Sequence, residues 1–523
     1  MNKNTMSRQI SILLLSMIIG TPLWAQNSVD NAFGYYNDAL LFSRTYTGGS
    51  ARMQGIGGAQ VSLGSDINAA YVNPAGLGSL LSSGITFTPS LDFSNTESKF
   101  MGNYSGDFKG NFNFANLGMA LHFPNEDNES GFKGLTFAIT LTRENNFHQN
   151  YFYDGFNDEE AGKSSIVDSY LDRAWGLDPD DLGGDLLDAY DQYLINPEIL
   201  TDAGTGQDFT GYYKVIGDFP RQIEKVRSRG AQYEWDFALG ANFMDKIYFG
   251  GALGINTIRY YTEQTYSESE YVFEGSIDEG IDLHSRRNTL KVDGTGVSGT
   301  FGMIVRPIPI LRLGATIKTP TLYGMREETS DDFLTLYNNL TFNDGTEDIT
   351  LDGEYYSEYL SESRYSLTTP WKLTTGGSLF LGKIGFLSAD IEFMDYSQAS
   401  VSSNDFIETD DNNAIKDLYQ NTINLRFGGE FRINQFMIRG GYNLDGDPYK
   451  NSAIDNSIQR ITGGIGYRNK DYFVDLAVVH TSWQSRRSPY TIYSFDDPNL
   501  DISPTASIDH SNVNVSVTFG VNF

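Results

Sequence analysis

Apolar and polar residues alternate strictly in several segments of the chain. At the C-terminal end, the odd-numbered positions from Val513 to Phe523 are apolar, and the positions between them carry Asn, Ser, Thr or Gly. The same period of two recurs at 311–318, 387–393 and 424–433, where the polar positions include charged residues. A period of two places alternate side chains on opposite faces of a strand. These segments therefore predict strands with one apolar and one polar face.

Fourteen segments of this kind are expected along the chain. They lie near 84–97, 110–122, 133–153, 230–242, 246–262, 288–306, 311–319, 369–382, 385–397, 422–433, 436–444, 457–468, 472–484 and 509–523. Strands of a membrane barrel need only ~9–11 residues each, and their apolar face points outward to lipid while the polar face lines the lumen. The pattern predicts an all-β fold, a fourteen-stranded antiparallel transmembrane β-barrel over residues 84–523.

The connections between these segments alternate between long and short. Long, acidic and turn-rich connections are expected at 154–229, 263–287, 320–369, 399–421 and 485–510. Tight turns are expected at 243–245, 307–310, 382–384, 434–435 and 469–471. Long extracellular loops and short periplasmic turns are typical of an outer-membrane barrel. The largest loop, 154–229, also carries apolar residues at helix-like spacing, which need a surface to pack on: Leu171, Trp175, Leu182, Leu186, Leu187 and Tyr190.

The first 25 residues predict a signal peptide. Lys3 and Arg8 precede the apolar run 10–19 and make the N-terminus positively charged, and residues 21–25 offer a cleavage site. Such a run is too short to span a bilayer, and we expect residues 1–25 to be removed. No later apolar run is long enough for a transmembrane helix. Together with the barrel pattern, this predicts a location in the bacterial outer membrane.

Residues 26–83 predict a small helical hatch, or plug, inside the barrel. An amphipathic helix of roughly three turns is predicted by the spacing of Phe33, Tyr36, Leu40 and Leu41. A glycine-rich stretch at 48–59 follows, and a short helix is then expected from Asp66, with Ser65 as its N-cap. Folded in the lumen, this segment would find a cover for its apolar side.

The hatch is expected to end in one rigid turn, which we interpret as its gating element. The turn comprises Asn73, Pro74, Ala75, Gly76 and Leu77. Pro74 fixes φ and lacks an N–H, and Gly76 can adopt a positive φ. The turn therefore predicts a firm joint between the hatch and the first strand.

Composition narrows the classes of function. The chain carries 67 acidic and 37 basic residues, a net charge of −30, so nucleic acid is not an expected partner. It has no cysteine, which removes thiol nucleophiles and thiolate metal sites. The G-x-G-x-x-G motif at 294–299 precedes a strand rather than the helix that dinucleotide binding requires. We expect no catalytic residue, metal or cofactor. The acidic run 178–191 is interpreted as a solvated loop, with a calcium site as the alternative.

Several segments resemble the FadL/TodX family of outer-membrane transporters. In the N-terminal region they are Gly58–Ser62, Asp66 and Asn73–Leu77. In the wall they follow in the order of the family as Leu311–Pro320, Pro370–Leu373, Asp390–Ser397, Leu425–Phe431, Arg439–Tyr442 and Gly464–Arg468. Residues 50–53 are similar to the Bacteroidetes branch. The resemblance implies a fourteen-stranded barrel, an N-terminal hatch, and uptake of long-chain fatty acids or other hydrophobic molecules through a lateral opening.

Two functions fit these observations. The first is a passive channel for hydrophobic small molecules. The second is a structural or interaction subunit of an outer-membrane secretion or assembly complex, because the resemblance extends to relatives such as PorV, which serves the type IX secretion system. The long loop at 154–229 favours the second function, and fold resemblance alone does not decide between them.

Charged residues on adjacent strands supply the candidate site, together with the first helix. The charged set is Asp390, Glu392, Arg426, Glu430, Arg432 and Arg439. They either pair across the wall and hold the hatch, or leave Arg426 or Arg439 free to bind a carboxylate head group. Phe33, Tyr36 and Leu40 either pack on the barrel or line the ligand pocket. The expected partners are outer-membrane lipid, a hydrophobic small-molecule ligand, and other outer-membrane proteins if the second function holds.

Overall fold

A computed structural model describes most of the chain. The described residues are 32–46, 48–125, 131–157, 163–202, 204–217, 219–273, 276–277, 280–493 and 501–523. The expected signal peptide, residues 1–25, lies outside them. No helix in this described part is long and apolar enough to cross a membrane.

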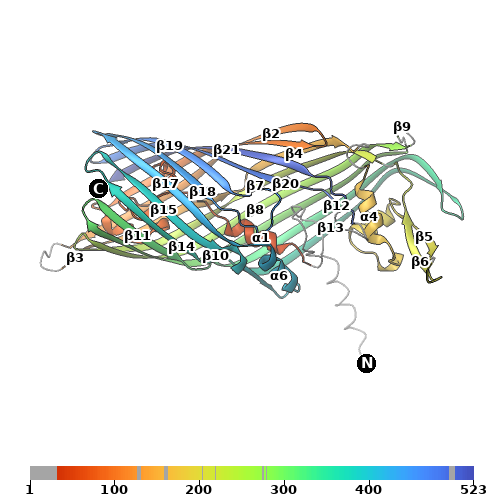
Figure 1. The fold of residues 1–523 in the computed structure, drawn as a ribbon, viewed down its shortest axis with the longest axis horizontal. Helices are drawn as coiled ribbons and strands as arrows, with labels where there is room; N and C mark the ends of the chain where they lie inside the picture. The colour runs from red at the N-terminus through yellow and green to blue at the C-terminus, as the bar shows by residue number, and fades with distance from the viewer. Residues whose placement is uncertain are drawn as a thin grey trace, which may run out of the picture.

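The described chain forms a closed antiparallel barrel of fourteen strands (Figure 1). The continuous strands are β1 (Gly84–Phe100), β2 (Asn103–Pro124), β7 (Phe219–Phe243), β8 (Ile247–Phe273), β10 (Ile281–Ile308), β17 (Asn421–Ile433), β18 (Phe436–Asp445), β19 (Ile458–Arg468), β20 (Tyr472–Arg487) and β21 (Ala506–Asn522). The strands built from two elements are β3 (Phe132–Asn146) with β4 (Gln149–Phe156), β11 (Leu311–Lys318) with β12 (Leu322–Asn343), β13 (Asp348–Thr368) with β14 (Lys372–Phe380), and β15 (Gly385–Asp395) with β16 (Ser400–Ser403). β21 pairs with β1 and closes the sheet. The predicted fold class and strand number are confirmed.

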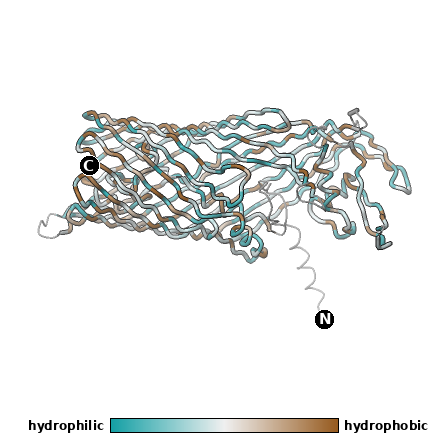
Figure 2. Tube along the Cα trace, viewed as in Figure 1, coloured by the Kyte–Doolittle hydropathy of each residue, from teal (hydrophilic) through white to brown (hydrophobic). Residues whose placement is uncertain are grey.

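Apolar side chains cover the outside of the barrel, and polar side chains fill the inside. In β15, Leu387 and Ile391 are 57% and 52% exposed, whereas Asp390 between them is 1% exposed. In β17, Phe427 points outward and Arg426 inward. Brown and teal positions accordingly alternate along the strands in Figure 2. A soluble protein turns its apolar face inward, so an apolar exterior around a polar interior is the arrangement of a wall that faces lipid.

The strands extend much further at one end of the barrel than at the other. Tight turns follow β7, β10, β14, β17 and β19, as expected. At the opposite end, β7, β8, β10, β12 and β13 reach 25, 27, 28, 22 and 21 residues, about twice the length or more that a bilayer requires. These five strands form a tall wall that continues beyond the apolar band.

Two connections that were expected to be loops belong to this tall wall. The segment Glu263–Arg287 lies mostly in β8 and β10, and Pro320–Thr369 is mostly the hairpin of β12 and β13. The two loop predictions are wrong because apolar alternation marks a strand only where one face meets lipid. Beyond the apolar band the outer face is polar, and the sheet shows no period of two in hydropathy. The two-residue element β9 (Ser276–Ile277) pairs with the end of β8.

Residues 32–83 lie inside the barrel. They form α1 (Tyr35–Ser43), α2 (Ala51–Gly55), α3 (Ala69–Val72) and the 3-10 helix η1 (Pro74–Ser79). The helix expected around Tyr36 is confirmed by α1. The expected start of a helix at Asp66 is wrong, since α3 begins at Ala69. Ser65 does not cap it, because Ser65 has a φ of 58° and its backbone N–H bonds to Ser79.

The long connection after β4 folds into a cap that packs on the inner side of the tall wall. It contains α4 (Ile166–Ala174), η2 (Pro179–Asp181), α5 (Asp185–Asp191), β5 (Asn196–Thr201) and β6 (Asp208–Tyr213). Its apolar residues pack on inward side chains of the tall wall, including Tyr266, Phe333 and Tyr337. On the other side it contacts the segment after β20, where the Tyr493 N–H donates to Asp172. The apolar spacing of this loop is therefore mostly satisfied within the chain, although Trp175 stays 45% exposed.

A buried ionic cluster ties the cap to the tall wall. Asp185 of α5 accepts hydrogen bonds from Arg173 of α4 at 2.6 Å and from Arg286 of β10 at 2.8 Å. Arg286 also pairs with Asp331 of β12 at 2.7 Å. Burial alone would raise the pKa of the Asp185 carboxyl, but the two guanidinium groups hold it well below its usual range. The pair therefore stabilises the cap above the unfolded-state pKa of about 4, and this stabilisation is lost as the pH falls below that value.

We predict that Arg286→Met detaches the cap from the wall. The change leaves Asp331 without its cation and Asp185 with Arg173 alone, and breaking a buried ion pair costs up to about 3–5 kcal/mol. Hydrogen exchange of the α4 and α5 amides measures the free energy of cap opening. Lys291→Met is the matched control, because Lys291 lies on the outer face of the same strand in an exposed pair with Glu328, where the cost is about 1 kcal/mol or less. Equal protection in both variants would contradict the role of the cluster.

Candidate functional site

The hatch rests directly on the backbone of the wall. The contact is made at a ring of inward-facing wall glycines, which we call the glycine collar: Gly240, Gly250, Gly302, Gly314, Gly428 and Gly441. A Cβ at Gly250 would overlap the backbone of Pro74 and Ala75, and a Cβ at Gly428 would overlap the Ile56 carbonyl. Only glycine permits such an approach of two backbones. The contact with the hatch thus explains why these six wall positions are glycine.

Polar anchors hold the hatch in this position. The Ala51 N–H donates to Thr518 of β21 at 2.7 Å, and the Val61 N–H donates to Asp390 of β15 at 2.9 Å. Arg52 of α2 lies 3.5 Å from Asp66 within the hatch and 3.5 Å from Glu430 of the wall. These anchors reach several wall strands, so the hatch is fastened around much of the lumen.

The turn at Asn73–Leu77 joins the hatch to the wall with a defined geometry. The Asn73 side chain caps η1 by accepting the Ala75 N–H at 3.1 Å, and its amide donates to the Val61 carbonyl at 2.7 Å. Pro74 occupies the first position of η1, where its missing N–H costs nothing. The expectation of a positive φ at Gly76 is wrong. A glycine is needed there because a Cβ would lie 2.9 Å from Ala69 Cβ and from Gly64 Cα.

The first helix of the hatch is held by carboxylates. The 3-10 helix η3 (Tyr396–Gln398) is followed further along the chain by α6 (Thr409–Leu418). Asp411 of α6 accepts hydrogen bonds from the N–H groups of Phe33, Gly34 and Tyr36 at 2.9, 3.0 and 3.1 Å. Burial raises the pKa of Asp38 in α1 to about 7, although a hydrogen bond from the Tyr365 hydroxyl acts against this. Phe33 packs on Phe406, and Tyr36 is buried among protein atoms.

The two arginines predicted to face a ligand are both ion-paired with the wall. Arg426 donates to Glu392 at 2.9 Å. Arg439 donates to Glu430 at 2.8 Å and to Asp475 at 2.6 Å, with 1% of its side chain exposed. The predicted pairing of opposite charges across β15, β17 and β18 is therefore present. Arg439 also lies against the hatch, since a Cβ at Gly55 would touch it.

A cavity of about 440 Å³ lies in the lumen beside α1 and α2. Leu40 is the one member of the predicted ligand pocket that lines it. The aromatic lining consists of Tyr46, Phe147, Tyr260, Tyr449 and Trp483. The polar lining is rich in amides and includes Asn37, Gln54, Asn145, Asn146, Gln149, Asn443, Asn512 and Asn514. The cavity therefore offers both apolar surface and hydrogen-bonding groups to a small molecule.

Two arginines that the sequence did not single out line this cavity. Arg460 of β19 donates to Asn443 at 3.0 Å and pairs with Asp445. Arg44, directly after α1, donates to the Asn456 carbonyl at 2.6 Å, and its buried Nε has no hydrogen-bond partner in the described structure. Arg460 could have been found as a polar position in an alternating strand. Arg44 could not, because its neighbours in space are far away in sequence.

The wall is interrupted next to this cavity. The ladder between β2 and β3 ends at the pair Asn116↔Thr142, close to a bulge in β2. Beyond that point β4 pairs with β7 and not with β2. It lies instead behind the β1–β2 hairpin, where the Tyr153 and Phe100 rings are 4.6 Å apart. The edge of β2 from Asn103 to Ala115 is therefore without a ladder partner on this side.

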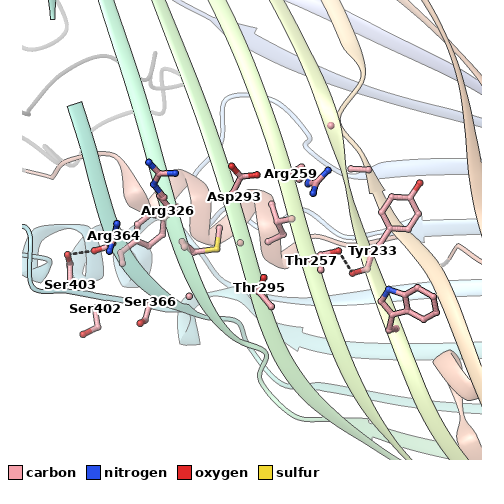
Figure 3. A pocket seen from close by; sticks show the side chains of 18 of the residues that line it. Tyr233, Thr257, Arg259, Asp293, Thr295, Arg326, Arg364, Ser366, Ser402 and Ser403 are labelled. Carbon is pink, nitrogen blue, oxygen red and sulfur yellow. Dashed lines mark hydrogen bonds between the residues drawn. The ribbon is translucent and has the colours of Figure 1, made fainter. Parts of the chain in front are cut away.

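A groove of about 1190 Å³ begins on the outside of the wall at the same place (Figure 3). Phe114, Leu141 and His148 line its beginning, and the groove then crosses β7, β8, β10, β12 and β13. Phe147 and His148 form the break between β3 and β4. Phe147 lines the lumenal cavity and His148 lines the outer groove. This two-residue break thus separates the inside of the barrel from the outside.

Comparison with known proteins shows which solved structures have a similar fold. No family model matches the sequence, and no curated protein matches it. A FadL homologue of Pseudomonas aeruginosa is 13% identical, over 91% of this chain and 98% of that chain, with a TM-score of 0.51. The toluene transporters TodX of Pseudomonas putida and TbuX of Ralstonia pickettii are 14% and 15% identical, over 92% and 91% of this chain and 100% and 99% of theirs, each with a TM-score of 0.49. The predicted FadL-like fold is confirmed by the first of these.

We predict that Gly250→Ala displaces the hatch, because its Cβ would overlap the backbone of Pro74 and Ala75. Overpacking of this kind costs about 1–3 kcal/mol. The neighbouring change Gly251→Ala is the control, since its Cβ would point outward and lie 3.6 Å from Phe301. Single-channel recordings in planar bilayers should show larger or more frequent openings for Gly250→Ala alone. Identical conductance in the two variants would refute a gating role of the hatch.

Proposed function

We propose that this barrel is a passive channel of the bacterial outer membrane for hydrophobic small molecules, with long-chain fatty acids as the first candidates. The apolar exterior supports the location, and the shared fold with a FadL homologue supports the class of function. The single observation that carries the proposal is the interrupted ladder between β2 and β3, because this stretch lies between the lumenal cavity and the outer groove.

The proposed path runs sideways through the wall. Phe147 lines the lumenal cavity and the adjacent His148 lines the outer groove, so the proposed way out of the cavity leads past Phe147. The Phe147 ring packs 5.1 Å from Tyr260 and 5.9 Å from Phe42 of α1. A small rotation of this ring would join the cavity to the groove at Phe114 and Leu141. Burial of an alkyl chain along this path supplies ~0.8 kcal/mol per methylene.

The polar end of a ligand would meet Arg44. Arg44 lines the cavity, its buried Nε has no hydrogen-bond partner among the described residues, and a guanidinium group binds a carboxylate strongly. Arg426 and Arg439 are already neutralised by carboxylates of the wall, so this role moves from them to Arg44. We further propose that a bound ligand is released by movement of the hatch at the turn Asn73–Leu77.

The alternative role, a subunit of a secretion or assembly complex, loses its main support. That support was an apolar loop in need of a partner. The cap residues of this loop pack on the barrel's own tall wall, and the transport path has both a cavity and an interruption of the wall in its favour.

We predict that Phe147→Ala speeds uptake of a fluorescent fatty acid into liposomes that contain the purified protein, and that Phe147→Trp slows it. Phe156→Ala is the control, because Phe156 is a half-buried phenylalanine of β4 that does not line the cavity. Loss of a buried phenyl ring costs about 3–5 kcal/mol, so thermal stability is measured alongside. Unchanged uptake in both Phe147 variants, with folded protein, would overturn the lateral path.

We predict that Val515→Arg hinders membrane assembly. Val515 lies on the outward face of β21 beside Leu91 and Val478, and an arginine near the bilayer midplane costs about 2–4 kcal/mol. Asp509→Arg places the same side chain on the same face beyond the apolar band, next to Glu97, and should assemble normally. Heat-modifiable mobility in gels measures the yield of folded barrel. Normal yield of Val515→Arg would contradict a lipid-facing wall.

A further inference from the structure

The outer groove follows the upper border of the apolar band across five strands. Three successive rows of directly opposed residues show this border. The lowest row is apolar: Trp235, Ile255, Val297 and Leu322. The middle row forms the groove floor and is mostly small: Tyr233, Thr257, Thr295, Gly324 and Ser366. The upper row is charged: Arg259, Asp293, Arg326 and Arg364.

Small side chains in the middle row create the hollow. A Cβ at Gly324 would meet nothing within 4 Å, so the floor is open to the outside. Figure 3 shows Arg259, Arg326 and Arg364 side by side along one edge of it, with Asp293 between the first two. The groove therefore has an apolar lower edge and a cationic upper edge.

Two cations near this edge lack a carboxylate partner. Arg326 pairs with Glu362 at 2.8 Å and Arg364 with the same carboxylate at 3.2 Å. Arg259 forms no ion pair with any described residue. Arg229 of β7 lies on the ring of Tyr261 at 4.3 Å and likewise pairs with no carboxylate in the described part of the chain.

Arg229 and Arg259 are diagonal neighbours on one face of the sheet. Arg259 is opposite Ala231, two residues from Arg229, a spacing of roughly 7–8 Å that long side chains can bridge. Like charges held so close on a rigid sheet repel each other, and Asp293, which lies opposite Arg259 and is shared with Lys291, offsets only part of this positive charge. In a chain with a net charge of −30, two neighbouring arginines that form no ion pair with a described residue are a specific feature of the lipid border.

We propose that Arg229 and Arg259 bind the phosphate-bearing head group of a membrane lipid, whose acyl chains lie along the apolar row below. The planar guanidinium groups fit phosphate oxygens in a bidentate manner, and the aromatic residues Tyr233 and Trp235 mark the interfacial level at which such a head group lies. A free anion would gain nothing from the apolar row below. The inference rests on the proposed outer-membrane location, and it concerns a lipid that stays bound rather than a transported ligand.

The test measures lipid binding by the purified full-length protein in detergent, with native mass spectrometry as the readout. Phosphatidic acid is the probe, and phosphatidylcholine, whose phosphate carries a compensating choline, is the comparison lipid. Arg229→Gln/Arg259→Gln should raise the dissociation constant for phosphatidic acid at least ~10-fold, since charge-assisted hydrogen bonds are lost. Lys225→Gln/Arg227→Gln is the matched control, because it removes two cations from the outward face of the same strand beyond the groove.

Weaker binding in the first double variant alone, with no competition by millimolar inorganic phosphate, supports the proposal. Equal binding in both double variants overturns it, and so does competition by inorganic phosphate at the same concentration as the lipid. Heat-modifiable mobility shows that each variant is folded. The assay contains no transport step. The lipid-binding result can therefore still be interpreted if the liposome experiments contradict the channel proposal.

Discussion

The hatch and the wall meet backbone to backbone, and the rest of the structure depends on this contact. Six inward-facing wall positions are glycines because the hatch chain occupies the space of their missing side chains. The hatch can therefore lie flat against the lumen and still satisfy its own N–H and C=O groups through wall side chains such as Thr518 and Asp390. With the lumen filled in this way, the cavity of about 440 Å³ lies beside α1 and α2 of the hatch. The proposed path from that cavity therefore leads toward the side of the barrel.

The interruption of the wall matters because the hatch fills so much of the lumen. A closed barrel satisfies every backbone group in lipid, and an open edge is costly there. The edge of β2 from Asn103 to Ala115 breaks this rule at the level of the lumenal cavity. β4 partly compensates by lying behind the β1–β2 hairpin, and Thr96 bonds to the Asn150 carbonyl at 2.9 Å. The departure from an ideal barrel thus coincides with the place where the proposed path crosses the wall.

The positions of the charged residues follow the local environment, which is lumen, lipid or water, and not the net charge of the chain. Inside the lumen, arginines and lysines meet carboxylates, as Arg439 meets Glu430 and Asp475. Such buried pairs contribute little net stability, because the loss of hydration offsets their attraction, but they position the groups that form them. On the outer surface the apolar band excludes charge, and Arg229 and Arg259, which form no ion pair with any described residue, lie just beyond it. The acidic excess is left to the cap and the surfaces outside the membrane level.

The sequence by itself determined the wall. A period of two with an apolar face needs no knowledge of distant contacts, so the strands, their number, the tight turns and the inward position of Arg426 and Arg439 could be read from local pattern. The tall wall could not, because beyond lipid the hydropathy of a strand loses its period. The site was also hidden: Arg44, Phe147 and His148 acquire their roles only when α1, β3 and β7 come together. Local pattern reports which face of a strand meets lipid, whereas a cavity and an unpaired strand edge are properties of the space between segments that are far apart in the chain, and only the tertiary structure decides them.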